Sequence, residues 1–362
     1  MNATLDRLQR AKNLPVQLNG KTINGLFEKY EEIGFLYPEK KALLKPHFQQ
    51  ISQNWDILLN SKEELLWMMT TDKQLIENDF ASITSWKQSN YCFFAQHLVS
   101  TGNPTMSLKI LLAAQDKAEF DHDESDIRAC QNWFRPNNRY AYRVFASIYD
   151  KLGEKKSSLL TFYYLHLSLN AIDANSQNNY VSEEVLGKDE ELIAFVTQQY
   201  GEVFVRGEEL DQADIQLDEI DAIYRKYNLS RRRKILKIRD QKTQQIVACI
   251  IANRGPLGLN FSFLESRAYY IVSKDLEESQ RQSVLAAMNF ATKSFYVNFE
   301  LQTIPIVTDD LTSKTLQTQS AILQRKYMQS IWLREGFADW YAHIYSFLKR
   351  IEERYERKKV RV

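Results

Sequence analysis

The sequence predicts a mixed α/β protein made of two tandem units, each a mixed sheet with helices on both faces. Three observations lead to this prediction. The chain has 362 residues, more than one hydrophobic core usually holds. The same order of helices and strands occurs twice along it. Residues 170–181, rich in Asn, Ser and Gln, separate the two occurrences and have the composition of a linker.

The first predicted unit covers residues 20–169 and follows a polar tail, residues 1–19. Apolar residues at helical spacing predict helices over 23–33 and 39–59. Aromatic and branched residues then predict three strands that pair as a meander, over 64–71, 80–87 and 91–99. A loop and a helix from Met106 come next, and the unit ends with a short strand, a helix and a strand over 128–134, 138–152 and 158–169.

The second predicted unit covers residues 182–348, before a charged tail over 349–362. In chain order its elements are two helices over 182–199 and 208–227, a hairpin over 234–240 and 245–253, a strand over 267–272, a helix over 276–295, a strand over 303–307, a helix over 311–326 and closing strands over 328–333 and 337–347. In both halves a crossover helix follows a meander and leads to a further strand. This order implies a mixed sheet covered by helices.

Composition narrows the class of partner. Hydrophobic residues make up 44% and charged residues 26% of the chain, as in folded proteins. The net charge of +1 gives no overall attraction to nucleic acid or to a membrane surface. Residues 1–12 lack the apolar core of a signal peptide, and no apolar stretch reaches spanning length. We therefore expect neither a membrane span nor a nucleic-acid partner.

The cysteines and histidines do not predict a metal site. Cys92, Cys130 and Cys249 lie far apart, which favours reduced thiols in a cytoplasmic protein over a disulfide framework. The five histidines are scattered, and the chain has neither an HExxH nor a CxxC motif. We expect no metal cofactor.

The loop Ser100-Thr101-Gly102-Asn103-Pro104-Thr105 joins an aromatic strand to a helix. Gly102 permits backbone angles that other residues resist. The first amides of the following helix and its dipole favour an anion such as a phosphate. The alternative is an ordinary turn, capped by Asn103 or Thr105.

The repeated order of elements resembles that of the acyl-CoA N-acyltransferase (GNAT) superfamily, and two tandem units resemble FemX-type aminoacyltransferases and N-myristoyltransferases. In that superfamily the loop between the fourth strand and the third helix holds the pyrophosphate of coenzyme A. The resemblance therefore implies an acyl-CoA as co-substrate, an amine as acceptor, and a cofactor site at Ser100, Thr101, Gly102, Asn103 and Thr105.

The corresponding loops of the two halves differ. The first keeps Gly102 but lacks the leading Gln or Arg of the family pattern. The second, residues 273–279, has no glycine and carries Asp275, Glu277 and Glu278, which would repel a pyrophosphate. The resemblance thus favours the first unit. The departure leaves open a second class, a catalytically inactive regulatory or adaptor protein that binds a protein or nucleotide partner.

Four further residues are candidates for the chemistry. His97 ends the aromatic strand and could act as a base through water, or be a packed core residue. The resemblance places Tyr140 where such enzymes often have a general acid. Arg135 and Arg139 flank a Pro-Asn-Asn turn and could bind the 3′-phosphate of coenzyme A or a substrate carboxylate. The alternative is an ordinary helix entrance capped by Asn138.

Charged residues of the second half have less specific interpretations. Glu265 and Arg267 could face a cleft or form an exposed pair. The basic run over 231–234 is typical of a solvated strand entrance. The glycine-bearing loop over 255–262 is expected to line a pocket.

Overall fold

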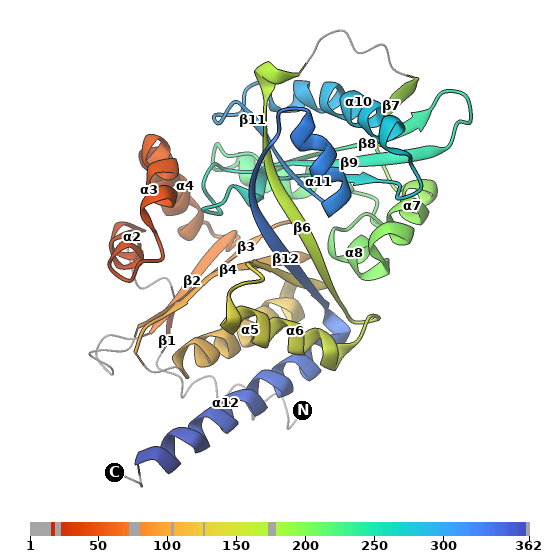
Figure 1. Ribbon diagram of the computed structural model, residues 1–362. Coiled ribbons are helices and arrows are strands. Elements are labelled where there is room, and N and C mark those ends of the chain that lie inside the picture. Colours follow the sequence, from red (N-terminus) through yellow and green to blue (C-terminus); the bar gives the residue numbers. More distant parts are fainter. Residues whose placement is uncertain are drawn as a thin grey trace. The chain divides into compact units, whose positions relative to one another are not determined.

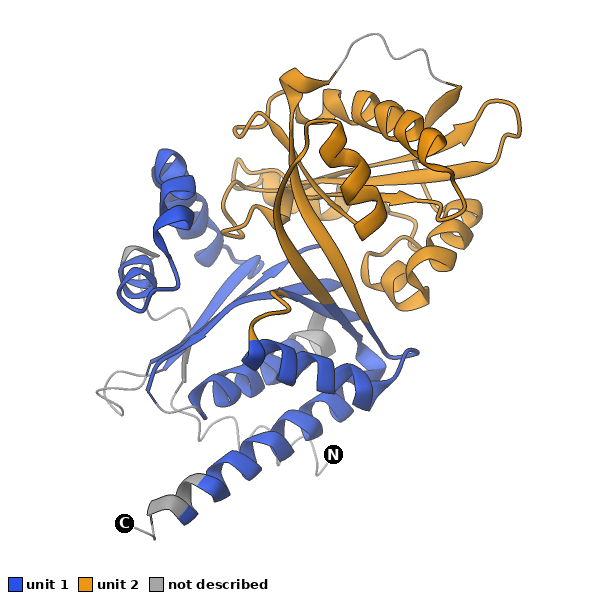
Figure 2. Cartoon of the chain, in the orientation of Figure 1, with its two compact units in different colours: residues 1–133, 139–158, 330–362 blue, residues 134–138, 159–329 orange. Residues whose placement is uncertain are grey.

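The computed structural model describes residues 16–18, 23–71, 80–102, 105–125, 127–172 and 179–359 (Figure 1). The chain forms two compact units (Figure 2). Unit 1 groups residues 1–133, 139–158 and 330–362, and unit 2 groups residues 134–138 and 159–329. The two units therefore do not meet at the predicted linker over residues 170–181. The long strands β6 (Ser157–Ser168) and β12 (Ile322–Leu333) each contribute residues to both units.

Unit 1 contains one sheet whose strands follow the order β1-β2-β3-β4-β5. These strands are β1 (Val16–Leu18), β2 (Leu66–Thr71), β3 (Ala81–Lys87), β4 (Cys92–Ser100) and β5 (Ala129–Phe134). The pairs are antiparallel except β4 with β5, which is parallel. The predicted meander is confirmed within two residues at each end of its strands.

Helices cover both faces of the unit 1 sheet (Figure 1). The helices of unit 1 are α2 (Ile23–Glu32), α3 (Pro38–Leu44), α4 (Phe48–Leu59), α5 (Met106–Ser125), α6 (Arg139–Leu152) and α12 (Phe337–Lys359). The α4 residue Trp55 stacks on His97 of β4, whereas α5 and α12 pack on the face that carries Trp67 and Phe93. Burial on both faces explains why β2 and β4 begin with runs of apolar residues, over 66–69 and 92–95.

The strands of unit 2 follow the order β6-β11-β10-β9-β8-β7, with β12 next to β6. Its other elements are β7 (Tyr180–Glu184), α7 (Glu190–Tyr200), α8 (Glu202–Gly207), α9 (Asp218–Arg225), β8 (Arg232–Asp240), β9 (Ile246–Arg254), β10 (Ala268–Val272), α10 (Glu278–Tyr296), β11 (Thr303–Thr308) and α11 (Asp310–Thr318). Among the described strand pairs from β6 to β7, β10 with β11 is parallel and the others are antiparallel. The repeated mixed architecture predicted from the sequence is confirmed.

Four predicted elements of the second half are wrong. In place of the predicted helix over 208–227, residues 208–217 form turns and α9 begins only at Asp218, because Leu217 has a φ of 67° and the Asp214 carboxylate accepts from the amides of Asp218 and Glu219. The acidic stretch over 182–184 is in β7 rather than a first helical turn, because Glu183 pairs with Arg239 and Glu184 pairs with Lys234 on β8. The predicted helix over 311–326 ends at Thr318 and β12 begins at Ile322. Residues 337–347 are in α12, not a closing strand. In the described ranges, no helix is long and apolar enough to cross a membrane.

Candidate functional site

The strands β4 and β5 separate part of the way along unit 1. Their parallel pairing runs from Cys92 opposite Ala129 to Ala95 opposite Asn132, whereas β4 continues to Ser100. A β-bulge shifts the register of β4 against β3 in the same region, and His97 there has a φ of 53°. Bulges bend a strand and interrupt its ladder, often beside functional sites. We call the separation beyond Ala95 the β4–β5 split.

The chain turns at the far end of the split and enters α5. Ser100 and Gly102 are exposed and Thr101 is half-buried, with its amide donating to the Phe80 carbonyl at 2.7 Å. Gly102 has a φ of 73°, so a side chain there would be strained. The predicted strand, glycine turn and helix are confirmed, and the N-terminus of α5 provides a partial positive charge at this turn.

Thr105 directly precedes α5 and is only 3% exposed. Its carbonyl accepts from the amides of Leu108 and Lys109 at 3.1 and 3.0 Å, which closes the first turn of the helix. Asn103, the remaining predicted residue of this loop, lies outside the described residues, so the choice of cap is not decided.

Tyr140 meets the first turn of α5. It is the second residue of α6, which follows β5, and its hydroxyl accepts a hydrogen bond from Ser107 Oγ at 2.7 Å. Burial raises the pKa of Tyr140 to about 12, and the hydrogen bond from Ser107 opposes this shift only in part. The phenol therefore keeps its proton at neutral pH and can act as a proton donor. Sequence reasoning missed Ser107, although its place one residue inside the helix start was a usable signal.

His97 lies in an aromatic shell. Its ring stacks on Trp55 at 5.6 Å between centroids, and the rings of Tyr30 and Phe35 approach it edge-on. Its Nδ1 is 3.2 Å from Thr84 Oγ1. Burial, with the positive charge of Lys40, lowers the pKa of His97 well below its ordinary value. These contacts favour the packing role over the role of base.

The two candidate arginines belong to different units. Arg139 is exposed and begins α6 in unit 1. Arg135 is half-buried and lies in the segment grouped with unit 2, where its carbonyl accepts from the Asn138 amide at 3.0 Å. Only Arg139 therefore shares a unit with the Gly102 turn.

The corresponding helix start in unit 2 carries its own anionic cap. Glu277 precedes α10, and its carboxylate accepts from the backbone of Gln280 while Gln280 Oε1 accepts from the Glu277 amide at 3.0 Å. A carboxylate already occupies the position that a phosphate would need.

Unit 2 buries an ionic cluster that includes Arg233, which was expected at a solvated strand entrance, and Arg267, which was expected either in a cleft or in an exposed pair. We call it the Glu208 cluster; it comprises Glu208, Arg233, Arg267, Tyr269 and Gln329. Arg267 and Tyr269 donate to Glu208 Oε1 at 3.0 and 2.8 Å, and both Glu208 and Arg267 are fully buried. The predicted solvated strand entrance is wrong, because Arg231 and Arg233 alternate inward around the exposed Arg232 at the start of β8. Of the two alternatives for Glu265 and Arg267, the exposed pair is excluded, because both side chains are fully buried.

The loop between β9 and β10 is part of the core of unit 2 rather than a wall of an open pocket. Leu257, Leu259, Phe261 and Phe263 are each at most 2% exposed. The carboxylate of Glu265 accepts from the amides at Gly258 and Asn260 at 2.8 and 3.2 Å and so fixes the loop. Burial raises the pKa of Glu265 to about 8.

Cys92, Cys130 and Cys249 are buried free thiols. Among the residues that the structure describes, no group of three or more His, Cys, Asp and Glu side chains is arranged to hold a metal ion.

No protein-family model matches the sequence, and no curated protein matches it. Similar solved structures include the GCN5-related N-acetyltransferase from Sphaerobacter thermophilus, with 10% identity over 79% of this chain and 85% of that chain and a TM-score of 0.40. A tandem GNAT protein from the clavulanic acid biosynthesis pathway has 8% identity over 78% and 87% of the two chains and a TM-score of 0.37. N-myristoyltransferase from Saccharomyces cerevisiae, with bound myristoyl-CoA, has 9% identity over 78% and 69% and a TM-score of 0.34. The element order behind the GNAT resemblance is present in both units of this chain, but these likenesses assign it no activity.

Proposed function

We propose that unit 1 binds an acyl-CoA and transfers its acyl group to an amine. One observation carries the proposal: the Gly102 turn and the start of α5 lie at the end of the β4–β5 split, and Tyr140 contacts the first turn of the same helix through Ser107. An anion-binding helix start and a proton donor therefore occur together, and this combination suits a thioester attached to a diphosphate.

Each part of such a ligand has a counterpart in unit 1. The pyrophosphate would bind at the Gly102 turn and the start of α5, since the positive end of a helix dipole favours anions. The pantetheine arm carries two amide groups. Those groups can pair with backbone groups near the Ser100 end of β4, past the last residue pair that joins β4 to β5.

The transfer needs one proton donor and accurate positioning. The amine attacks the thioester carbonyl and the carbon–sulfur bond breaks. Tyr140 gives its proton to the leaving thiolate and then takes a proton from the newly bonded nitrogen. The products are an amide and free coenzyme A, and Tyr140 is again a protonated phenol. Ser107 holds the phenol in place through its hydrogen bond.

A second candidate is a protein that binds acyl-CoA without transferring the acyl group and acts through a protein partner. The observation in its favour is the enclosed position of His97, which leaves the expected base packed among Trp55, Tyr30 and Phe35. Binding of the thioester with no release of thiol in the presence of varied amines would favour this candidate.

The test compares two glycine variants by isothermal titration with coenzyme A and acetyl-CoA. Gly102→Glu puts a carboxylate at the proposed pyrophosphate site. Gly34→Glu is the matched control, because Gly34 is also exposed and has the same φ of 73°. We expect Gly34→Glu to bind as the wild type does and Gly102→Glu to lose binding at least tenfold. Equal affinity of the two variants for coenzyme A would contradict a pyrophosphate site at this turn.

A further inference from the structure

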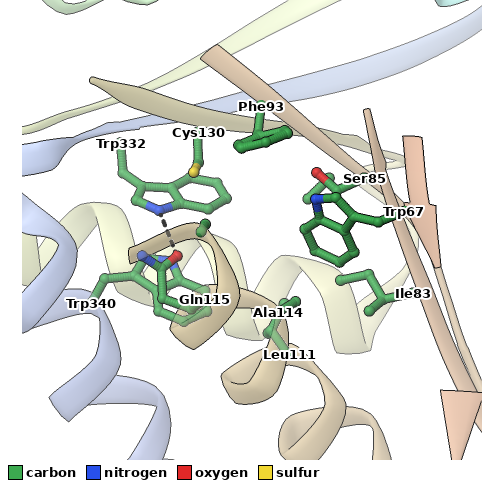
Figure 3. A pocket seen from close by; sticks show the side chains of 12 residues that line it. Trp67, Ile83, Ser85, Phe93, Leu111, Ala114, Gln115, Cys130, Trp332 and Trp340 are labelled. Atoms are coloured by element: carbon green, nitrogen blue, oxygen red, sulfur yellow. Dashed lines mark hydrogen bonds between the residues drawn. The ribbon is translucent and has the colours of Figure 1, made fainter. Parts of the chain in front are cut away.

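Unit 1 encloses a small cavity between its sheet, α5 and α12, with Trp67, Trp332 and Trp340 in its lining (Figure 3). Its volume is about 20 Å³, enough for one water-sized group. We assign this cavity no ligand, because Trp332 Nε1 already donates to Gln115 Oε1 and the ring nitrogens of Trp67 and Trp340 are buried in the packing. Accessible polar groups lie instead in unit 2, on the face of β6 that carries His166.

His166 is a hydrogen-bond acceptor held in one orientation. The hydroxyl of Tyr164, two residues earlier on the same face of β6, donates to the Ser262 carbonyl at 2.7 Å, so its hydrogen is used. His166 Nε2 lies 2.7 Å from the same hydroxyl oxygen and must therefore donate to it. Burial lowers the pKa of His166 to about 4, so the ring is neutral at pH 7 and Nδ1 carries the lone pair.

The Nδ1 atom of His166 is accessible. The side chain is half-buried. Nδ1 has no hydrogen-bond partner among the residues that the structure describes, yet it is not enclosed as the tryptophan nitrogens of unit 1 are. The contact with Tyr164 therefore fixes a ring whose second nitrogen is open to a ligand.

Ser262 supplies a hydrogen-bond donor beside this acceptor. Its amide donates to Asn260 Oδ1 at 2.8 Å and its carbonyl accepts from Tyr164. Tyr327 of β12 donates to Ser262 Oγ at 2.9 Å, and the hydroxyl hydrogen of Ser262 has no acceptor in the described part of the chain. The side chain is half-buried. Three contacts thus hold a serine whose own hydrogen is unused.

The backbone beside Ser262 adopts an uncommon conformation. Phe263, the next residue, is fully buried and has a φ of 57°, which residues other than glycine rarely adopt. Such residues persist only where the surrounding structure holds them, and they cluster at functional sites. The contacts of Tyr164 and Tyr327 with Ser262 hold the chain here, so the position of the serine is fixed.

The free donor and the free acceptor define the kind of group that would bind them. Ser262 and His166 are held by one atom, the Tyr164 oxygen, which is 2.7 Å from Ser262 O and from His166 Nε2. A carboxylate would meet the lone pair of Nδ1, and an ammonium ion would leave the Ser262 donor unused. A neutral hydroxyl group both donates and accepts a hydrogen bond, so it satisfies both side chains.

We propose that His166 and Ser262 bind the hydroxyl group of a neutral alcohol on unit 2. The hydroxyl donates to His166 Nδ1 and accepts from Ser262 Oγ, while Tyr164 positions both residues. The inference does not rest on acyl transfer, because every residue that carries it belongs to unit 2.

The experiment measures dissociation constants of four small compounds for the full-length protein by ligand-observed NMR. The compounds are cyclohexanol, cyclohexanecarboxamide, cyclohexylamine and cyclohexanecarboxylate, which share one ring and differ in the polar group. We expect cyclohexanol to bind most tightly, at least tenfold more tightly than the amine and the carboxylate. His166→Phe and Ser262→Ala should each weaken binding of cyclohexanol at least tenfold.

His343→Phe is the control. His343 is also half-buried and its Nε2 lies 3.0 Å from a hydroxyl, that of Ser147, but it belongs to unit 1. This variant should bind cyclohexanol as the wild type does.

A second measurement needs no variant. Proton–nitrogen NMR correlation spectra of the histidine rings in the wild type at pH 7 should show His166 with its hydrogen on Nε2 and none on Nδ1. A hydrogen on Nδ1 would refute the role of acceptor.

The binding measurements can also overturn the inference. Tighter binding of the carboxamide or of either charged compound would exclude a site selective for hydroxyl groups. The inference also fails if no compound binds saturably, or if cyclohexanol binds equally well to the wild type and to both the His166→Phe and Ser262→Ala variants.

Discussion

Replacing Arg267 with methionine tests how the Glu208 cluster holds unit 2 together. Methionine keeps much of the side-chain volume but removes the guanidinium, which donates to Glu208 Oε1, Tyr269 OH and the Leu264 carbonyl at 3.0, 2.9 and 2.8 Å. Glu208 would remain fully buried with one fewer donor. Removing one partner of a buried ion pair costs about 3–5 kcal/mol of unfolding free energy.

The expected loss for Arg267→Met is about 3 kcal/mol, at the lower end of that range. The reason is that Tyr269, Gln329 and Arg233 still donate to the Glu208 carboxylate. The assay is urea unfolding followed by far-ultraviolet circular dichroism. Combining Arg267→Met with Glu208→Gln should cost at least ~1 kcal/mol less than the sum of the single changes, since the two side chains interact directly.

Arg239→Met is the control for this measurement. Arg239 also pairs with two carboxylates, those of Glu183 and Glu191, but both partners are about half exposed to solvent. Exposed pairs contribute about 0–1 kcal/mol. If Arg267→Met is no more destabilising than Arg239→Met, the buried Glu208 cluster contributes no more to the free energy of unfolding than an exposed ion pair does.

Three further outcomes are expected. Burial raises the pKa of Glu265 from 4.5 to about 8, so the folded state favours the protonated acid. The unfolding free energy of the wild type should therefore fall, relative to that of Glu265→Gln, as the pH rises from about 5 to 8. Parallel pH dependences of the two proteins in urea unfolding would contradict this. Tyr140→Phe should lower kcat for thiol release by a factor of ~10²–10⁴ with KM changed less than threefold, since only proton donation is lost; unchanged kcat would exclude Tyr140 as the acid. His97→Phe should destabilise unit 1 by about 1 kcal/mol, through loss of the contact with Thr84. It should reduce kcat less than tenfold, and a reduction of more than a hundredfold would indicate that His97 acts as a base.

The predictions of fold succeeded where the pattern was local. Short runs of aromatic and branched residues predicted β2, β3 and β4, because such side chains are favoured in strands. Gly102 was recognised as a turn residue from its neighbours alone, and its φ of 73° explains the choice of glycine. The repeated order of elements followed from the same local patterns.

The predictions failed where the partner was distant in sequence. Glu183 and Glu184 are consistent with either a helix start or a strand edge, and only the cations of β8 decide between them. Arg233 was predicted to be solvated, and Arg267 was left between a cleft and an exposed pair, because the sequence does not show that Glu208 pairs with both of them. A charged side chain enters a core only with its counter-charge, so its burial depends on an element elsewhere in the chain.

The sequence by itself determined the two mixed α/β units, the strand meander of the first and the glycine turn at the start of α5. The tertiary structure alone decided that the pairing of β4 with β5 ends at Ala95, that Ser107 contacts Tyr140, that His97 is packed among aromatic rings and that three tryptophans help to line a small cavity. The physical reason is the range of the interactions: backbone preference and periodicity act between neighbours, whereas burial, hydrogen-bond pairing and pKa depend on side chains that only the fold brings together.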